Sequence, residues 1–416
     1  MKPANRPASL AEVVQGGLCS SCGICASIDP RIEMRLAPNG NLRPHLPAET
    51  DPALVEVCPG ATVIGADPAA LDEGTTLDPV WGPRRAMHRA WATDAEVRHT
   101  AAAGGVLTAL GMFLLESGRV DAILHVRASG DDPTLTLPQI SRTPAEVLSG
   151  AQSRYGPVAP LVPVMDLLTE GIRFAVIAKP CDLNAIRNLG RRDPRVDEQI
   201  AYLLTIFCGT TASRHMPRDM AAAHGMDPDA LTTFRYRGLG WPGLTTLEDA
   251  AGNRAELNYR EAYLDEAETR WTYDAPWRCK VCPDQLGEVA DLSVPDGWIL
   301  DAEGRPLHDE APGINVIFER TAHGSELVAA AVEAGALELA DLSDRDFECM
   351  HADHRGYRLG EPGRLAGLRE AGAAEPRTQG YRFAQMIELA GDEYLAAQRD
   401  GTLARIAQGQ SAEPLV

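Results

Sequence analysis

The residues of this sequence best suited to chemistry are its cysteines. The chain has nine of them among 416 residues. The first four follow the order Cys19-x-x-Cys22-x-x-Cys25 and then Cys58-Pro59, which is typical of a ferredoxin site where four thiolates hold one 4Fe-4S cube. A structural zinc site is the alternative, but tetrahedral zinc normally takes two Cys-x-x-Cys pairs rather than a triplet and a Cys-Pro. We therefore expect an iron–sulfur cluster on this first cysteine set.

Four further cysteines form a dispersed second set. Cys181 and Cys208 each follow an apolar run, and the segment Cys279-x-x-Cys282-Pro283 adds a pair. Four thiolates are the number that a second cluster requires. Spacing alone leaves alternatives open, because the pair could bind zinc or act as a redox dithiol, and single cysteines at strand ends are commonly buried apolar residues. Cys349 belongs to neither set, so a packed or surface thiol is its simplest interpretation.

Helices and strands alternate in the part of the chain that must position these cysteines. A glycine turn and an apolar helix at residues 101–117 precede a strand at 120–126. A short helix precedes a buried strand at 174–178, and residues 201–208 repeat the apolar run, so that two strands deliver a cysteine at their ends. The alternation predicts an α/β fold. In an open α/β sheet, ligands bind at the carboxyl ends of the strands.

Composition narrows the class of protein. A formal net charge of -20 repels phosphate backbones, so nucleic acid is a poor partner. No segment approaches the roughly 18–20 uninterrupted apolar residues of a membrane-spanning helix, and the start, residues 1–6, lacks the apolar core of a signal peptide. We expect a cytoplasmic protein, in which thiols stay reduced and clustered cysteines bind metal more often than they pair.

A flavin is the cofactor that such clusters would need for organic chemistry. Clusters pass one electron at a time, whereas most organic reductions need a hydride or an electron pair, and a flavin converts between the two. Gly104 and Gly105 before a helix would let the backbone approach a phosphate or ribityl chain, although a plain helix start is the commoner explanation. The loop lacks the Rossmann and P-loop glycine fingerprints.

Other side chains could also contact a flavin. Lys179, two residues before Cys181, could stabilise negative charge on a reduced flavin, and an exposed strand-end lysine is the alternative. Arg235 and Arg237 could pair with flavin phosphates in bidentate fashion. Trp241 could form a wall of the flavin site or simply fill the core.

One run of the sequence resembles a known family. Residues 277–284, Trp-Arg-Cys-Lys-Val-Cys-Pro-Asp, with their continuation through residues 287–293 and 296–298, are similar to the signature of the beta-subunit family of coenzyme F420 hydrogenase and dehydrogenase. The resemblance covers roughly residues 15–340. Other segments agree with the family in order: 103–110, 141–144, 153–155, 179–181 with Arg187, 207–209 and 234–243.

The resemblance implies electron transfer with flavin and iron–sulfur groups. The family also includes reductases of chlorophyll derivatives and subunits that serve hydrogenases, formate dehydrogenases and glutamate synthases. The resemblance assigns Cys181, Cys208, Cys279 and Cys282 to the cluster beside the flavin, which we expect to be FAD. The expected FAD contacts are Gly104, Gly105, Thr108, Ser153, Arg154, Tyr155, Lys179, Arg235, Arg237 and Trp241.

We expect four regions in the chain. Residues 1–66 form a ferredoxin-like 4Fe-4S domain, and residues 67–83 form a linker, because proline and glycine break any regular period there. Residues 84–340 form a mixed α/β body that holds FAD and the second cluster. Residues 341–416 form a helical C-terminal extension that packs across the body or makes a subunit contact, as in a homo-oligomer.

The leading functional hypothesis is a reductase. Ferredoxin or another one-electron donor would feed the first cluster, electrons would cross to the second, and FAD would reduce a small organic substrate. His99, His125 or a carboxylate would donate the proton, and Lys179 would be a further catalytic residue. The alternative is a subunit that exchanges hydride with coenzyme F420 and passes electrons to a partner enzyme. A third class, a zinc-stabilised binding module, would need neither flavin nor iron.

Overall fold

The computed structural model of the chain describes residues 3–264 and 275–416. Its centre is an eight-stranded mixed sheet in the order β16-β6-β15-β14-β10-β9-β7-β8. Strands β7, β9, β10 and β14 pair in parallel, and the others are antiparallel to their neighbours. The strands are β6 (Ala86–Ala92), β7 (Ala122–Ala128), β8 (Thr136–Ser141), β9 (Phe174–Ile177), β10 (Ile200–Thr205), β14 (Leu292–Ser293), β15 (Asn315–Glu319) and β16 (Leu337–Ala340).

Helices cover both faces of this sheet. In β9, Phe174 and Val176 belong to one hydrophobic layer and Ala175 to the other, because successive side chains of a strand point to opposite faces. Burial on both faces is what parallel strands require. The first layer is covered by α7 (Val164–Glu170), α8 (Pro180–Gly190) and α9 (Arg195–Gln199), and the second by α4 (Ala95–Thr100), α5 (Val106–Glu116), α6 (Pro144–Ser149) and α13 (Ala322–Glu333).

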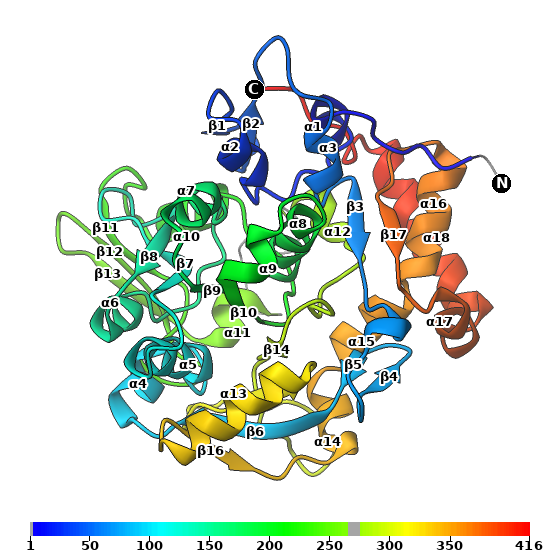
Figure 1. The fold of residues 1–416 in the computed structure, drawn as a ribbon. Coiled ribbons are helices and arrows are strands. Elements are labelled where there is room, and N and C mark those ends of the chain that lie inside the picture. Colours follow the sequence, from blue (N-terminus) through cyan, green and yellow to red (C-terminus); the bar gives the residue numbers. More distant parts are fainter. Residues whose placement is uncertain (1–2, 265–274) are drawn as a thin grey trace.

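The N-terminal segment packs on the first of these layers and lies at the top of Figure 1. Cys22, Ile24 and Val57 join the hydrophobic cluster formed by α7 and α8. The segment therefore sits over the body rather than apart from it. Its elements are α1 (Leu10–Gln15), α2 (Ile24–Ile28), the hairpin of β1 (Glu33–Leu36) and β2 (Leu42–His45), α3 (Leu54–Val57) and β3 (Thr62–Ile64).

The C-terminal region is helical and contacts the N-terminal segment directly. Leu365 and Leu368 pack against Leu10 and Leu54, and β17 (Arg377–Gln379) pairs in parallel with β3. Figure 1 shows the orange and red C-terminal helices beside the blue N-terminal strand. The helices are α14 (Asp344–Met350), α15 (Ala352–Leu359), α16 (Glu361–Ala371), α17 (Phe383–Ala390) and α18 (Asp392–Ala407).

A smaller three-stranded antiparallel sheet lies beside the body. Its own hydrophobic cluster includes Phe234, Tyr236 and Leu247 together with Met216 and Met220. It carries the residues that precede and follow the Gly238–Gly243 loop. Its elements are α10 (His215–Ala223), β11 (Leu231–Arg235), β12 (Thr245–Asp249), β13 (Arg254–Leu257) and α11 (Tyr259–Tyr263).

The mixed α/β class and the helical C-terminal region expected from the sequence are confirmed. Residues 67–83, expected to be a linker, carry the short helix η1 (Pro68–Ala70) and most of a hairpin of β4 (Thr76–Asp78) and β5 (Gly82–Arg84). Proline and glycine serve a tight turn here, in which the Asp78 carboxylate accepts the amide protons of Val80 and Trp81 at 2.8 Å. The division into four domains stays a prediction.

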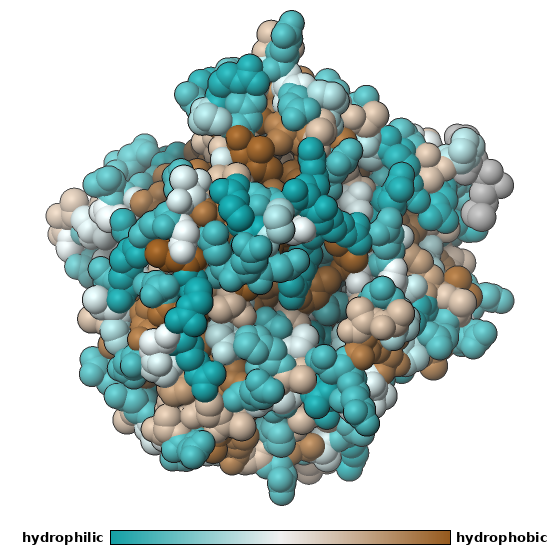
Figure 2. Space-filling view, in the orientation of Figure 1, coloured by the Kyte–Doolittle hydropathy of each residue, from teal (hydrophilic) through white to brown (hydrophobic). Residues whose placement is uncertain are grey.

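The molecular surface is mainly hydrophilic in the view of Figure 2, as the net charge leads one to expect. Hydrophobic residues on this face show as several separate patches, one of them in a recess near the top. Within residues 3–264 and 275–416, no helix has the length and apolar character needed to cross a membrane.

Candidate redox site

The second cysteine set meets at the carboxyl edge of the parallel strands. Cys181 lies in the first turn of α8, directly after β9, and Cys208 follows β10. The sequence placed Cys181 at the strand end, but Pro180 begins the helix because its ring presets the helical φ. Cys279 is the last residue but one of the short helix α12 (Trp277–Lys280), and Cys282 lies two residues after the helix. All four thiols line one cavity.

Two hydroxyl groups hold the Cys279–Cys282 loop. The Tyr357 hydroxyl of α15 donates to the carbonyl of Cys279 at 2.5 Å and accepts from the amide of Cys282 at 3.2 Å. Thr211 Oγ1 lies 3.7 Å from the Cys279 sulfur. The C-terminal helices therefore fix the loop that carries half of the second set.

The first cysteine set is built on a left-handed glycine. Gly23 has φ +81 and begins α2, and a Cβ at this position would lie 2.8 Å from Val162 and 2.9 Å from Ala159. A close approach of this kind favours glycine. The turn aims Cys22 and Cys25 inward, and Cys58 reaches them from the end of α3.

Burial raises the pKa of thiols in both sets. Burial raises the pKa of Cys58 to about 12 and that of Cys282 to about 11. Burial also raises the pKa of Cys22 well above its ordinary value, and the neighbouring Cys58 and Cys25 raise it further. A reactive dithiol needs a lowered pKa, and the raised pKa of Cys282 does not favour that alternative for the second set. Metal binding would instead remove the protons.

The number of thiols in each set bears on the kind of metal group. Zinc–sulfur bonds of about 2.3 Å hold tetrahedral thiolates about 3.8 Å apart. Among the residues that the structure describes, no group of three or more His, Cys, Asp or Glu side chains has the spacing of a single-ion site. A 4Fe-4S cube binds one thiolate at each of its four irons, so it needs four cysteines. Both four-cysteine sets fit the larger group by donor number and chemistry.

A second, mainly apolar cavity of ≈230 Å³ adjoins the cysteine cavity. Lys179 and Thr211 line both. Gly105, with φ +75 at the start of α5, contributes to the wall. Of the residues predicted to contact a flavin or to act as the acid, the lining includes Gly105, Thr108, Ser153, Arg154, Tyr155, Lys179 and His125.

Polar atoms with no partner face this cavity. Gln152 Oε1 and Asp182 Oδ1 are buried and accept no hydrogen bond in the described part of the chain, and both residues line the cavity. A polar ligand that donates hydrogen bonds would satisfy them. Burial lowers the pKa of Lys179, but the Asp182 carboxylate at 2.7 Å outweighs that effect, so the pKa lies above its ordinary value. The cavity thus presents a permanent cation and fits a flavin by these criteria.

His125 lies in the cavity wall as a neutral side chain. Burial lowers its pKa to about 4, and Nε2 is 2.7 Å from the Ser141 hydroxyl. His99 is exposed on α4 and is not among the residues that line the cavity. The structure therefore brings one of the two candidate histidines to the site.

The two candidate arginines lie behind the cavity wall rather than in it. Arg235 donates to the carbonyls of Thr100 and Ala151, at 2.5 and 2.9 Å. Arg237 donates to the carbonyl of Ala102 at 3.0 Å and pairs with Asp296 at 2.8 Å. Both guanidinium groups thus support the wall, although Arg235 Nε is buried and donates to no residue in the described part of the chain.

Arg154, Trp241 and Gly104 are likewise structural in their contacts. Arg154 lines the cavity, but its guanidinium donates to three carbonyls, at 2.8 to 3.0 Å. Trp241 is buried with Arg237 5.0 Å over its ring. A Cβ on Gly104 would lie 2.7 Å from backbone atoms of Ala90 and Asn315, so this glycine permits close packing on the sheet.

Three residues of the site were not identified from the sequence. Asn315 lines the apolar cavity, and Tyr357 holds the cysteine loop. Neither carries a local sequence signal, since each acts through a distant backbone contact. Arg278 lines the cysteine cavity, and its position beside Cys279 is a signal that could have found it, because a cation next to a thiolate is electrostatically favourable.

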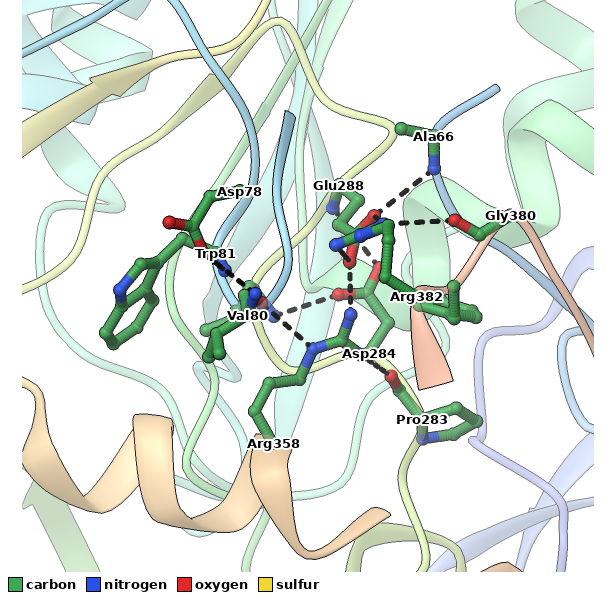
Figure 3. A network of polar contacts seen from close by, with 12 residues as sticks. Ala66, Asp78, Val80, Trp81, Pro283, Asp284, Glu288, Arg358, Gly380 and Arg382 are labelled. Carbon is green, nitrogen blue, oxygen red and sulfur yellow. Dashed lines mark hydrogen bonds and ion pairs between the residues drawn. The ribbon is translucent and has the colours of Figure 1, made fainter. Parts of the chain in front are cut away.

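A buried ionic network joins the loop after Cys282 to the C-terminal region (Figure 3). Glu288 pairs with Arg358 of α15 and, at 2.5 Å, with Arg382. Arg358 also donates to the carbonyl of Pro283, directly after Cys282. Burial raises the pKa of Glu288, but the two arginines outweigh it and hold that pKa below its ordinary value.

Comparison with known proteins gives matches over most of this body. The family model for the coenzyme F420 hydrogenase/dehydrogenase beta subunit N-terminal region matches residues 87–166, and the model for its C terminus matches residues 171–345. The coenzyme F420 hydrogenase beta subunit of Methanococcus voltae is 28% identical over 269 residues, which are 61% of this chain and 83% of that protein. The coenzyme F420-dependent sulfite reductase of Methanocaldococcus jannaschii is 22% identical over 70% of this chain and 44% of its own length.

A solved structure has a similar fold. One chain of the F420-reducing [NiFe] hydrogenase complex from Methanosarcina barkeri superposes with a TM-score of 0.51 and 22% identity, over 69% of this chain and 94% of that chain. The matched family regions include Cys181, Cys208, Cys279 and Cys282 and leave out residues 1–86, which hold the first cysteine set.

Proposed function

Because this chain belongs to the coenzyme F420 hydrogenase/dehydrogenase beta subunit family, we propose that it is an iron–sulfur flavoprotein subunit that exchanges hydride with coenzyme F420 and passes single electrons to a partner oxidoreductase. The observation that carries the proposal is the continuity of the two cavities. Lys179 and Thr211 line both, and Cys19 of the first set lines the cysteine cavity beside the second set. The relatives named for coenzyme F420 favour this function over ferredoxin-dependent reduction of an organic substrate.

In this proposal each cysteine set binds one 4Fe-4S cluster, and the apolar cavity binds FAD. A bound flavin would supply hydride exchange on one side and single-electron exchange on the other. The positive φ of Gly105 opens the N terminus of α5 to the ligand. Gln152 Oε1 and Asp182 Oδ1 accept hydrogen bonds. The proposed cofactor contacts are the predicted residues that line the cavity, and Arg235, Arg237 and Trp241 support its wall from behind.

Lys179 is the side chain best placed to manage charge at the site. Its raised pKa keeps Nζ protonated at neutral pH, so it stabilises negative charge that develops in the cavity. His125 is neutral at pH 7 because its pKa is about 4, so it can offer a hydrogen bond but no cationic acid. We therefore assign the proton-holding role to Lys179 Nζ.

A second candidate function is ferredoxin-dependent reduction of a small organic substrate. The observation that favours it is the first cysteine set, since Cys19, Cys22, Cys25 and Cys58 lie outside the regions matched by the family models. A cluster there would accept single electrons from ferredoxin without any partner subunit.

Anaerobic cofactor analysis and half-reactions test the proposal. Protein purified without oxygen should contain about eight iron and eight sulfide per chain and should release FAD. Reduced coenzyme F420 should bleach the flavin and cluster absorbance within one mixing experiment, and reduced ferredoxin should do so more slowly. Fully loaded protein that coenzyme F420 cannot reduce would refute the F420 function, and fast reduction by ferredoxin alone would then favour the second candidate.

A further inference from the structure

Arg278 reaches from one cysteine set to the other. It lies in α12 next to Cys279 of the second set, with only 2% of its surface exposed. Its Nη2 donates to the carbonyl of Pro59 at 3.1 Å, and Pro59 directly follows Cys58 of the first set. Arg278 also lines the cavity that holds the thiols of the second set, and Cys19 of the first set lines the same cavity. One guanidinium therefore faces both sets.

The rest of this guanidinium has no hydrogen-bond partner. Nε and Nη1 are both buried, and neither donates to any residue within the described ranges. Burying an uncompensated cation is costly unless a negative group pairs with it. The free donors therefore point to a negatively charged group that belongs between the two sets.

Other charges near the cysteines are already compensated. Arg43, close to Cys19, pairs with Glu413 at 2.5 Å. Lys179 pairs with Asp182 at 2.7 Å. In the parts of the chain that the structure covers, Arg278 makes no ion pair within 4 Å.

The carboxylate that interacts with Arg278 over a longer range is also compensated. It belongs to Glu361, and it pairs with Arg364 at 3.1 Å.

We propose that Arg278 is a positioning residue shared by both clusters, whose single cation raises the reduction potentials of the two together. When one electron leaves one cluster and enters the other, no proton moves and the summed charge around Arg278 is unchanged. The cation thereby favours the reduced form of each cluster without opposing transfer between them. This inference rests on the proposed function, because it requires both cysteine sets to hold clusters.

Redox titration of Arg278 variants tests this role. In Arg278→Gln, the electron paramagnetic resonance signals of both reduced clusters should titrate at more negative potentials. We expect about a tenfold loss in each one-electron reduction equilibrium, equivalent to about 59 mV. Arg278→Lys, which keeps the charge, should retain both potentials. The matched control is Lys280→Gln. Lys280 is a cation next to Cys279 in the chain, as Arg278 is, but it donates to Gln410 at the surface.

The outcomes separate this inference from the proposed function. Unsubstituted protein with fewer than two clusters overturns both. Two clusters in every variant with only one potential shifted, or with an equal shift in Lys280→Gln, overturns the shared role of Arg278 alone. If Arg278→Gln loses a cluster, the remaining one must still shift. If Arg278→Gln loses both clusters, retention of iron in Arg278→Lys supports the need for the positive charge. Loss of iron from Arg278→Lys as well overturns the shared role of Arg278.

Discussion

Glu288→Gln should be among the most destabilising single changes in this protein. The substitution keeps the shape of the side chain and removes the charge that faces two buried guanidinium groups, those of Arg358 and Arg382. Breaking a buried ion pair leaves an uncompensated charge and costs about 3–5 kcal/mol. Whole proteins are stable by only about 5–15 kcal/mol. The variant should therefore lose a large fraction of its free energy of unfolding.

Urea unfolding of anaerobic protein, followed by far-ultraviolet circular dichroism, measures this loss. The control is Glu170→Gln, which removes a carboxylate from the exposed pair with Arg142 and should cost about 0–1 kcal/mol.

The effect should also depend on pH. The folded protein holds the pKa of Glu288 below its ordinary value of 4.5. The stabilisation is therefore complete above about pH 4.5 and is lost as the pH falls through the lower, folded-state value. Equal losses in Glu288→Gln and Glu170→Gln at pH 7 would refute the reasoning.

Three other predictions concern the clusters, a buried histidine and the C-terminal residues. Cys22→Ala should retain about four iron and its FAD, whereas Cys279→Ala should lose both the second cluster and FAD, because metal binding is coupled to folding; FAD loss from Cys22→Ala alone would contradict this. His125 has a folded pKa of about 4 against an ordinary 6.5, so its stabilisation is complete above pH 6.5 and falls by about 3 kcal/mol toward pH 4. The denaturation midpoint of His125→Asn should change less with pH over that range. An unchanged pH dependence would contradict the assignment. Glu413→Gln leaves the buried Arg43 unpaired and should speed release of iron from the first cluster to a chelator, with unchanged release counting against it.

Local patterns in the sequence were sufficient for the α/β class and for the grouping of cysteines at strand ends. The strands at β7, β9 and β10 and the glycine turn before α5 all follow from apolar periodicity and from turn residues. The hydrogen-bond partners of the two candidate arginines could not be predicted in this way. Arg235 and Arg237 were expected to bind phosphates, but they donate to backbone carbonyls of the wall. Such contacts join residues more than a hundred positions apart, and no local period encodes them.

The ionic network of Glu288 was beyond prediction for the same reason. Its partners, Arg358 and Arg382, come from a region that looked only charged and helical. The hairpin in residues 67–83 was missed because proline and glycine mark a tight turn as readily as a flexible connection.

The pairing of Arg43 with Glu413 has a consequence for biosynthesis. The two residues are 370 positions apart, and ribosomes add about 5–20 residues per second. An emerging N-terminal segment must therefore wait roughly 20–70 s for its partner carboxylate. During that interval the first four cysteines are displayed without their final cover. The cluster proposed for this set would then have a period of that length in which to form before Arg43 is paired.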